Sequence, residues 1–171
     1  MLVKIPYGAD FMQIELPEGT QRISDTQALR LEPVKDLRST VRSALSAPQG
    51  SAPLPELVRS SSRVVIAFDD LTVNSYGPVR GIVIKELLDV LKKAGVGQEN
   101  VTLICANALH RKFRPEELAR VVGGDLVTAF GPRLLCHDAE DPEALVYLGK
   151  TPGGYDVEIS RHVAESDQRT G

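Results

Sequence analysis

The sequence has little of what marks several large classes of protein. It contains two cysteines, each inside an apolar run, which indicates buried thiols that pack as small hydrophobic groups and gives no sign of an oxidising compartment. No stretch approaches the ~20 apolar residues that a membrane-spanning helix needs, and the N-terminus lacks the apolar segment of a secretion signal. We therefore expect a cytoplasmic protein with no membrane partner.

A surplus of positive charge is also missing. The formal net charge at pH 7 is -3 and the isoelectric point is about 5.6, whereas nucleic-acid-binding proteins normally carry a basic stripe. We therefore expect no nucleic-acid partner. The 171 residues do have a globular composition, 42% hydrophobic and 25% charged, which suits one domain with a buried core.

Several motifs with known chemistry are absent as well. There is no G-x-x-x-x-G-K-[ST] phosphate loop, no G-x-G-x-x-G dinucleotide fingerprint and no G-x-S-x-G nucleophile elbow. Phosphate-loop and hydrolase classes are thereby excluded. Histidine and cysteine spacing forms no closed ligand set of the zinc type, so we expect no metal site made by this chain alone.

Short apolar runs alternate with amphipathic stretches along the middle of the chain. Runs of strand length at 63–68, 101–106 and 133–136 predict buried strands. Between the first two, apolar residues at helical spacing predict a helix over 78–94 that Gly95 terminates. This alternation is typical of an α/β, Rossmann-like, mostly parallel sheet flanked by helices. Further helices are expected over 37–45, 53–58 and 115–122.

Two short β elements are expected beside this sheet. Residues 3–16 alternate loosely around a turn signal, which predicts a small N-terminal hairpin. Residues 145–149 and 155–160 flank Thr151-Pro152-Gly153-Gly154, which predicts a C-terminal hairpin. We interpret residues 1–171 as a single domain, with no further element in the polar tail.

Polar loops follow all three predicted strands, at 69–72, 107–111 and 137–141. Ligands of open parallel sheets bind beyond the carboxyl ends of the strands, so these loops are where a site is expected. His110 titrates near neutral pH and can act as a general acid or base, and His137 can do the same or orient a substrate. We expect Asp70 and His110 to face one cleft, with His110 at least partly exposed.

Each of these residues also has a purely structural interpretation. Asp70 can simply cap the following helix or bind loop amides, as aspartate often does in turns. A structural His110 would be buried with both ring nitrogens bonded to the backbone, and the His137 ring can be bonded to a loop carbonyl. His162 lies off the predicted edge, where we expect it to be exposed.

At these residues the sequence resembles the N-terminal domain of the lactate racemase family, the nickel-pincer-dependent 2-hydroxyacid racemases and epimerases. The likeness covers nearly the whole chain, in family order. It is carried by Ile5-Pro6-Tyr7-Gly8, Pro53-Leu54-Pro55-Glu56-Leu57, Asp70-Leu71-Thr72, Ala106-Asn107-Ala108-Leu109-His110-Arg111, His137-Asp138-Ala139, Leu145-Val146-Tyr147-Leu148-Gly149 and Val163-Ala164-Glu165-Ser166-Asp167. In that family a hydride passes from the α-carbon of the substrate to the pincer and returns to either face of the keto acid.

The resemblance also implies roles for individual residues. His110 would be one of two proton-transfer histidines, and Asp70 would belong to the same catalytic group. The family's D-x-T-R loop binds the substrate carboxylate through its Arg, but this sequence has Val73 there, which makes lactate a doubtful substrate. Arg80 is the nearest candidate to replace that Arg. The matched substrate contacts are Thr72, Asn107, Arg111 and His137.

Other parts of the family's site match positions beyond Gly171. These are the second acid/base histidine, the lysine that carries the cofactor and the histidine that binds nickel. The resemblance therefore implies a nickel pincer nucleotide held mainly by a C-terminal domain or partner chain, and a 2-hydroxy acid as substrate. A domain without that partner exposes apolar surface, so we expect self-association. The alternative is a non-catalytic module that binds a small anion or a partner domain at the same edge.

Overall fold

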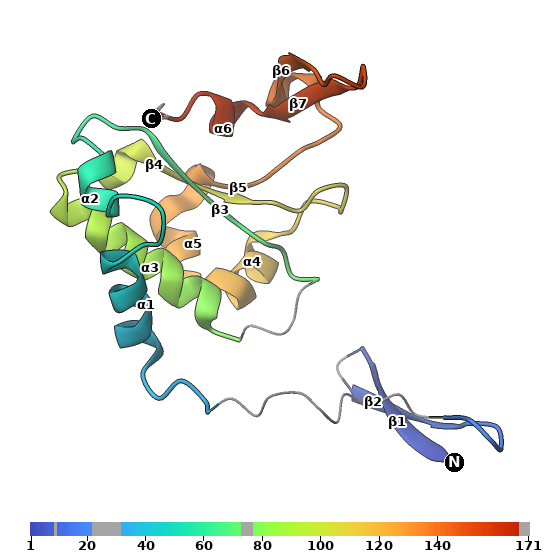
Figure 1. The fold of residues 1–171 in the computed structure, drawn as a ribbon. Coiled ribbons are helices and arrows are strands. Elements are labelled where there is room, and N and C mark those ends of the chain that lie inside the picture. Colours follow the sequence, from blue (N-terminus) through green and yellow to red (C-terminus); the bar gives the residue numbers. More distant parts are fainter. Residues whose placement is uncertain (9, 22–31, 73–76, 168–171) are drawn as a thin grey trace. The chain divides into compact units, whose positions relative to one another are not determined.

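The chain is organised as two compact units, Met1–Pro33 and Val34–Gly171. The structure is a computed structural model, and it describes residues 1–8, 10–21, 32–72 and 77–167 (Figure 1). Within the described ranges, no helix is long and apolar enough to cross a bilayer. The interpretation of residues 1–171 as a single domain stays a prediction.

The first unit contains the predicted N-terminal hairpin. Strands β1 (Leu2–Tyr7) and β2 (Asp10–Glu15) pair in antiparallel fashion, with Val3 opposite Ile14 and Ile5 opposite Met12. Gly8 adopts a φ of 63° at the turn, a conformation that glycine tolerates better than other residues. The N-terminal β element is therefore confirmed.

The second unit is built around a parallel sheet. Its strands are β3 (Val64–Phe68), β4 (Val101–Cys105) and β5 (Leu134–Cys136), in that spatial order. All three were predicted within two residues of their observed ends. The fold class, a Rossmann-like parallel sheet flanked by helices, is confirmed.

The three strands end at one level of the sheet. Phe68 is opposite Cys105, and Cys105 is opposite Cys136. The backbone N–H of Ala106 donates to the Phe68 carbonyl at 2.8 Å, and that of His137 donates to the Cys105 carbonyl at 2.9 Å. The loops after β3, β4 and β5 therefore start side by side.

Helices α3 (Val79–Lys93), α4 (Pro115–Val122) and α5 (Gly124–Phe130) lie on the same side of this sheet (Figure 1). The connections from β3 to β4 and from β4 to β5 step in one direction, and right-handed crossovers in one direction place their helices on one face. The hydrophobic core lies between that face and the helices. Its residues include Phe68, Ile84, Leu91, Leu103, Cys105, Leu118, Val122, Leu126, Phe130 and Leu134.

Helix α5 was not predicted from the sequence. The sequence predicts a helix over 115–122 and none after it, but Gly123, with a φ of 102°, turns the chain and Gly124 begins a second helix. Leu126 and Phe130, four residues apart on α5, are both buried in the core. The short helix α6 (Arg161–Ala164) was also missed.

Helix α1 (Leu37–Ser46) packs against α3 through ion pairs, and the short helix α2 (Leu54–Leu57) follows it. The Glu86 side chain of α3 is only 2% exposed and pairs with Arg38 at 2.9 Å and Arg42 at 2.6 Å. The hydrogen bond from Arg42, with the charges of both arginines, holds the pKa of Glu86 below its usual value against the effect of burial. None of the α1 residues is fully buried, but Leu37, Val41 and Leu45, at spacings of four, are partly buried, so the helix presents an apolar stripe as well as these charges.

The predicted C-terminal hairpin is confirmed. Strands β6 (Leu145–Lys150) and β7 (Asp156–Ser160) pair in antiparallel fashion, with an irregularity between Tyr147 and Gly149. Between the strands, the N–H of Thr151 donates to the Tyr155 carbonyl at 2.8 Å. Three one-turn 3-10 helices complete the described elements, at Gln98–Asn100, Gly131–Arg133 and Pro142–Ala144.

Candidate functional site

Asp70 and His110 lie together beyond the carboxyl ends of β3 and β4. The Oδ2 atom of Asp70 is 2.5 Å from Nδ1 of His110. The Asp70 side chain is 5% exposed, whereas that of His110 is 52% exposed. The expected proximity of the two residues and the expected exposure of His110 are therefore both observed.

The second oxygen of Asp70 shapes its own loop. Oδ1 accepts hydrogen bonds from the Thr72 N–H at 2.9 Å and from the Thr72 hydroxyl at 2.5 Å. This is the local turn that the structural interpretation of Asp70 anticipated. One carboxylate therefore holds the loop with one oxygen and faces His110 with the other, so the structural and functional interpretations are compatible.

The charge state of Asp70 determines which ring nitrogen of His110 carries a proton. Burial opposes ionisation, but hydrogen bonds from His110 and Thr72 outweigh it and hold the pKa of Asp70 below its usual value. Asp70 is therefore a carboxylate at neutral pH, and a carboxylate only accepts hydrogen bonds. Its contact with Nδ1 requires a proton on Nδ1, which leaves Nε2 of a neutral His110 ring as the basic nitrogen.

Asn107 shapes the turn that presents His110. Its side chain is buried, and its Nδ2 donates to the His110 carbonyl at 2.9 Å while the His110 N–H donates back to the Asn107 carbonyl at 2.8 Å. Between them Ala108 adopts a φ of 47°, an uncommon conformation for a residue other than glycine. No described group bonds the buried Asn107 Oδ1. Asn107 therefore holds the backbone of the turn that carries His110.

Arg111, a predicted substrate contact, is bound to Glu117 of α4. Its two terminal nitrogens lie 2.9 and 2.6 Å from the Glu117 carboxylate oxygens, and its guanidinium packs over the Phe113 ring. Glu117 also accepts from the Arg114 N–H at 2.9 Å, which closes the start of α4. The bond to Arg111, reinforced by that N–H, lowers the pKa of Glu117 to about 2. Arg111 is thus tied to a helix terminus.

His137 begins the loop after β5 and is partly exposed. Its N–H bonds the Cys105 carbonyl, but no ring hydrogen bond is present within the described ranges. The neighbouring Asp138 pairs with Lys112 from the loop after β4. The loops after β4 and β5 are therefore joined by an ion pair, as Asp70 and His110 join those after β3 and β4.

Arg80 and Asp69 form an ion pair behind Asp70, which the sequence analysis did not anticipate. Arg80 lies in the first turn of α3 with its side chain 8% exposed. Its Nε donates to Asp69 Oδ1 at 2.8 Å, its Nη2 contacts Asp69 Oδ2, and Nη2 also donates to the Asp70 carbonyl at 3.3 Å. Arg80, considered above as a replacement carboxylate binder, is thus bound to a carboxylate of the chain itself. Val73, the position of the family's Arg, lies outside the described residues.

The Cys105 thiol near this edge is not a nucleophile. Burial raises the pKa of the Cys105 thiol to about 12, with further contributions from Cys136 and Asp70. Cys136 is bound at its sulfur by the N–H of Phe113 at 3.3 Å. Both cysteines therefore serve the packing of the strand ends, as the sequence predicts.

The described residues do not fit a metal ion. In residues 1–8, 10–21, 32–72 and 77–167, no group of three or more His, Cys, Asp or Glu side chains is arranged to hold one. The nickel of the implied cofactor therefore has no ligand set in this part of the chain.

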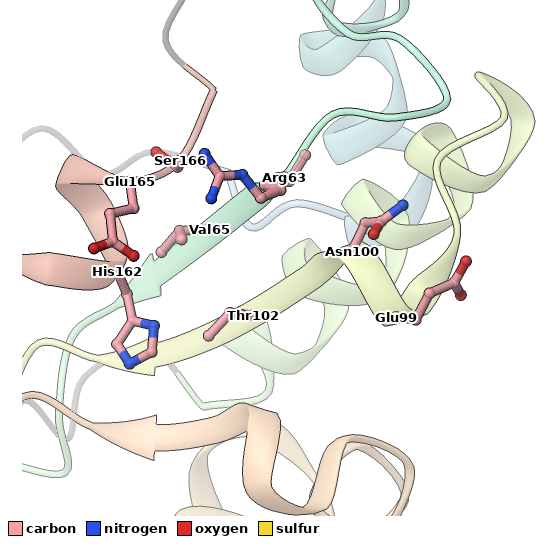
Figure 2. A pocket seen from close by; sticks show the side chains of 9 residues that line it. Arg63, Val65, Glu99, Asn100, Thr102, His162, Glu165 and Ser166 are labelled. Carbon is pink, nitrogen blue, oxygen red and sulfur yellow. The ribbon is translucent and has the colours of Figure 1, made fainter.

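A pocket of about 200 Å³, here called the strand-start pocket, lies at the beginnings of β3 and β4, away from Asp70 and His110 (Figure 2). Figure 2 shows the His162 ring beside Thr102, and Arg63 near Ser166. Two of its charged residues are paired, because Arg63 lies 4.0 Å from Asp167, and Glu165 lies 3.7 Å from Arg161. His162 is exposed there, as predicted, and does not belong to the candidate site.

Comparisons with known proteins agree on one family. The family model described as the lactate racemase N-terminal domain matches residues 7–171. A lactate racemase of Lactiplantibacillus plantarum is 29% identical over 130 residues, which are 76% of this chain and 29% of that protein. The chain thus spans about a third or less of the relatives it matches.

Two solved structures share the fold of this chain. The lactate racemase apoprotein from Thermoanaerobacterium thermosaccharolyticum superposes with a TM-score of 0.68 at 25% identity, over 98% of this chain and 37% of that one. A Thermotoga maritima protein shares the fold, with a TM-score of 0.52 at 17% identity over 75% of this chain and 30% of its own. The match to nearly the whole sequence shows that this chain belongs to the lactate racemase N-terminal domain family.

Proposed function

We propose that this chain supplies a proton-transfer site to a racemase or epimerase that acts on 2-hydroxy acids. The observation that carries this proposal is the 2.5 Å contact between buried Asp70 and exposed His110. Asp70 fixes the ring and holds the proton on Nδ1, so that Nε2 is directed away from the carboxylate. A substrate hydroxyl within ~2.6–3.2 Å of Nε2 could give up its proton there and later regain it.

The other predicted site residues take supporting places in this scheme. The Thr72 hydroxyl is engaged with Asp70 and helps hold that carboxylate in position. His137, on the adjacent loop, has a partly exposed ring and is the better candidate for a direct substrate contact. Asn107 and Arg111 already bond within the chain, so contacts from either residue to a substrate stay predictions. The cytoplasmic location also stays a prediction.

Family membership implies a nickel pincer cofactor in the full enzyme, which would accept and return the hydride when bound. The described residues offer no metal site, so we assign the cofactor's ligands to a C-terminal domain or partner chain. In this scheme the N-terminal domain contributes one acid/base group and the substrate loops.

A non-catalytic binding module is the second candidate function. It is favoured by the pairing of Arg80 and Arg111 with carboxylates of the chain itself, which leaves both guanidinium groups engaged within the chain. In such a module His110 would bind an anion or a partner domain without moving a proton during turnover.

An activity assay separates the catalytic function from the binding function. The full-length protein is incubated with 2-hydroxy acids, and the product is examined by chiral analysis. His110→Ala should lower the rate by roughly 10²- to 10⁴-fold, the usual contribution of a general acid/base. His162→Ala is the matched control, because this histidine is also exposed but lies at the strand-start pocket. If both variants keep the wild-type rate, His110 is not the proton-transfer group.

A further inference from the structure

Arg80 is placed where it can control Asp70 through the main chain. It is the second residue of α3, and its guanidinium is nearly enclosed at the exit of β3. A cation in the first turn of a helix is unfavourable next to the positive end of the helix dipole. Helix stability therefore does not explain an arginine at this position. The explanation has to come from the contacts of the Arg80 side chain.

The described contacts include two consecutive residues, Asp69 and Asp70. The planar fork binds both carboxylate oxygens of Asp69, and the nitrogen that contacts Oδ2 also donates to the main-chain carbonyl of Asp70. A bidentate guanidinium fixes a carboxylate in orientation as well as distance. Arg80 therefore constrains the backbone from which the Asp70 side chain leaves, while that side chain bonds Thr72 and His110.

We propose that Arg80 is a positioning residue that sets the Asp70–His110 contact through Asp69 and the Asp70 carbonyl. The proposal rests on the proposed function, because it assigns Arg80 to the proton-transfer site described above. Within the described residues, Arg80 has no hydrogen bond to His110, which bonds Asp70 instead. It acts by holding the Asp70 carboxylate at the distance where His110 keeps its proton on Nδ1, and a displacement of ~1 Å at such a site can cost ~10²-fold in rate.

The protonation pattern of the His110 ring tests this directly, because a residue that only stabilises the fold would not change it. The ¹⁵N NMR signals of the ring show which nitrogen carries the proton when the ring is neutral. In the wild-type chain we expect Nδ1–H. In Arg80→Met and Arg80→Lys, both folded by circular dichroism, we expect loss of that form and appearance of Nε2–H. Arg120→Met, which removes an exposed arginine of α4, should keep the wild-type signals.

Two further measurements keep the test decisive. Asp69→Asn changes a carboxylate that is 45% exposed, and it should produce the same shift to Nε2–H even if the Arg80 variants fail to fold. In the full-length enzyme, Arg80→Lys should lower kcat with little change in KM. Wild-type ring signals in folded Arg80→Lys and Asp69→Asn would overturn the role of Arg80 and leave that of His110 intact. Loss of the His110 role would instead appear as full activity in His110→Ala.

Discussion

The carboxylate of Asp70 and the imidazole of His110 meet at 2.5 Å although 40 residues separate them in the sequence. The contact exists because β3 and β4 are parallel and end at one level, with Phe68 opposite Cys105. Each residue lies in the loop that follows its strand. The contact thus depends on sheet register, and a shift of one strand along the other would break it.

Removing the charge of Asp70 should disable His110 without unfolding the chain. In Asp70→Asn the amide oxygen can still accept from Thr72, but the amide can no longer act as an anionic acceptor for Nδ1–H. We expect isomerisation by the full-length protein to fall by roughly 10²- to 10⁴-fold, because the ring loses its fixed tautomer. Steady-state kinetics check this, with Asp138→Asn as the control on the adjacent loop. Equal rates for Asp70→Asn and wild type would contradict the role of Asp70.

The ion pairs of Glu86 should make the stability of the chain dependent on pH. Its pKa is lowered in the folded state, chiefly by the hydrogen bond from Arg42, so the carboxylate stabilises the fold above the unfolded glutamate pKa of ~4.3. That contribution is lost as the pH falls through the lower, folded pKa. We expect Glu86→Gln to have a lower Tm than wild type at pH 7, and a smaller difference in strong acid.

Thermal unfolding followed by circular dichroism between neutral and acidic pH measures this effect. The exposed Glu116 of α4 supplies the control variant Glu116→Gln, which should follow the wild-type curve. A Glu86→Gln variant as stable as wild type at pH 7 would show that α1 is held on α3 by something other than these ion pairs.

The unpredicted helix α5 should be integral to the core. Phe130 is one of the largest fully buried side chains of the chain, and truncation of such a phenylalanine typically costs ~3–5 kcal/mol. Phe130→Ala should therefore lower the free energy of unfolding by about that amount in urea titrations. Thr128→Ala changes an exposed residue of the same helix and should have a much smaller effect. Similar stabilities for the two variants would mean that α5 is not part of the cooperative unit.

The exposed apolar side chains predict concentration-dependent self-association. Tyr147, Leu148 and Tyr155 of the C-terminal hairpin region are all exposed, and so is Leu109 next to His110. Exposed apolar surface of this kind can be covered by another protein surface. Sedimentation velocity should show a rising average mass with concentration, reduced in Leu148→Lys. A single monomeric species over the whole concentration range would contradict this.

Much of the fold could be predicted because its signals are local. The strands β3 and β4 are short apolar runs, and α3 has a regular apolar stripe between Pro78 and Gly95. Helix α5 could not be predicted in the same way, because Gly123-Gly124 is a normal helix terminator and the remaining segment is too short to show a clear period. Only the backbone conformation of Gly123 shows that the chain turns there into a second helix.

The candidate site could be predicted in outline and not in its contacts. Parallel strands bring the loops that carry Asp70 and His110 to one edge, which sequence order alone indicates. The pairing of Arg80 with Asp69, and of Arg111 with Glu117, depends on how α3 and α4 are set against the strands. No sequence motif marks Asp69 or Glu117 as the partner of an arginine. The sequence alone therefore could not show that Arg80 and Arg111 are bound within the chain.

The ring protonation of His110 in the wild-type chain tests the central claim most directly. It is read from the ¹⁵N signals of the imidazole at a pH where the ring is neutral, with and without the Asp70→Asn substitution. The account predicts Nδ1–H with a bare Nε2 in the wild type, and loss of that preference when Asp70 is neutralised. A neutral His110 that carries its proton on Nε2 in the wild type would contradict the account, because the nitrogen meant to accept the substrate proton would already be occupied.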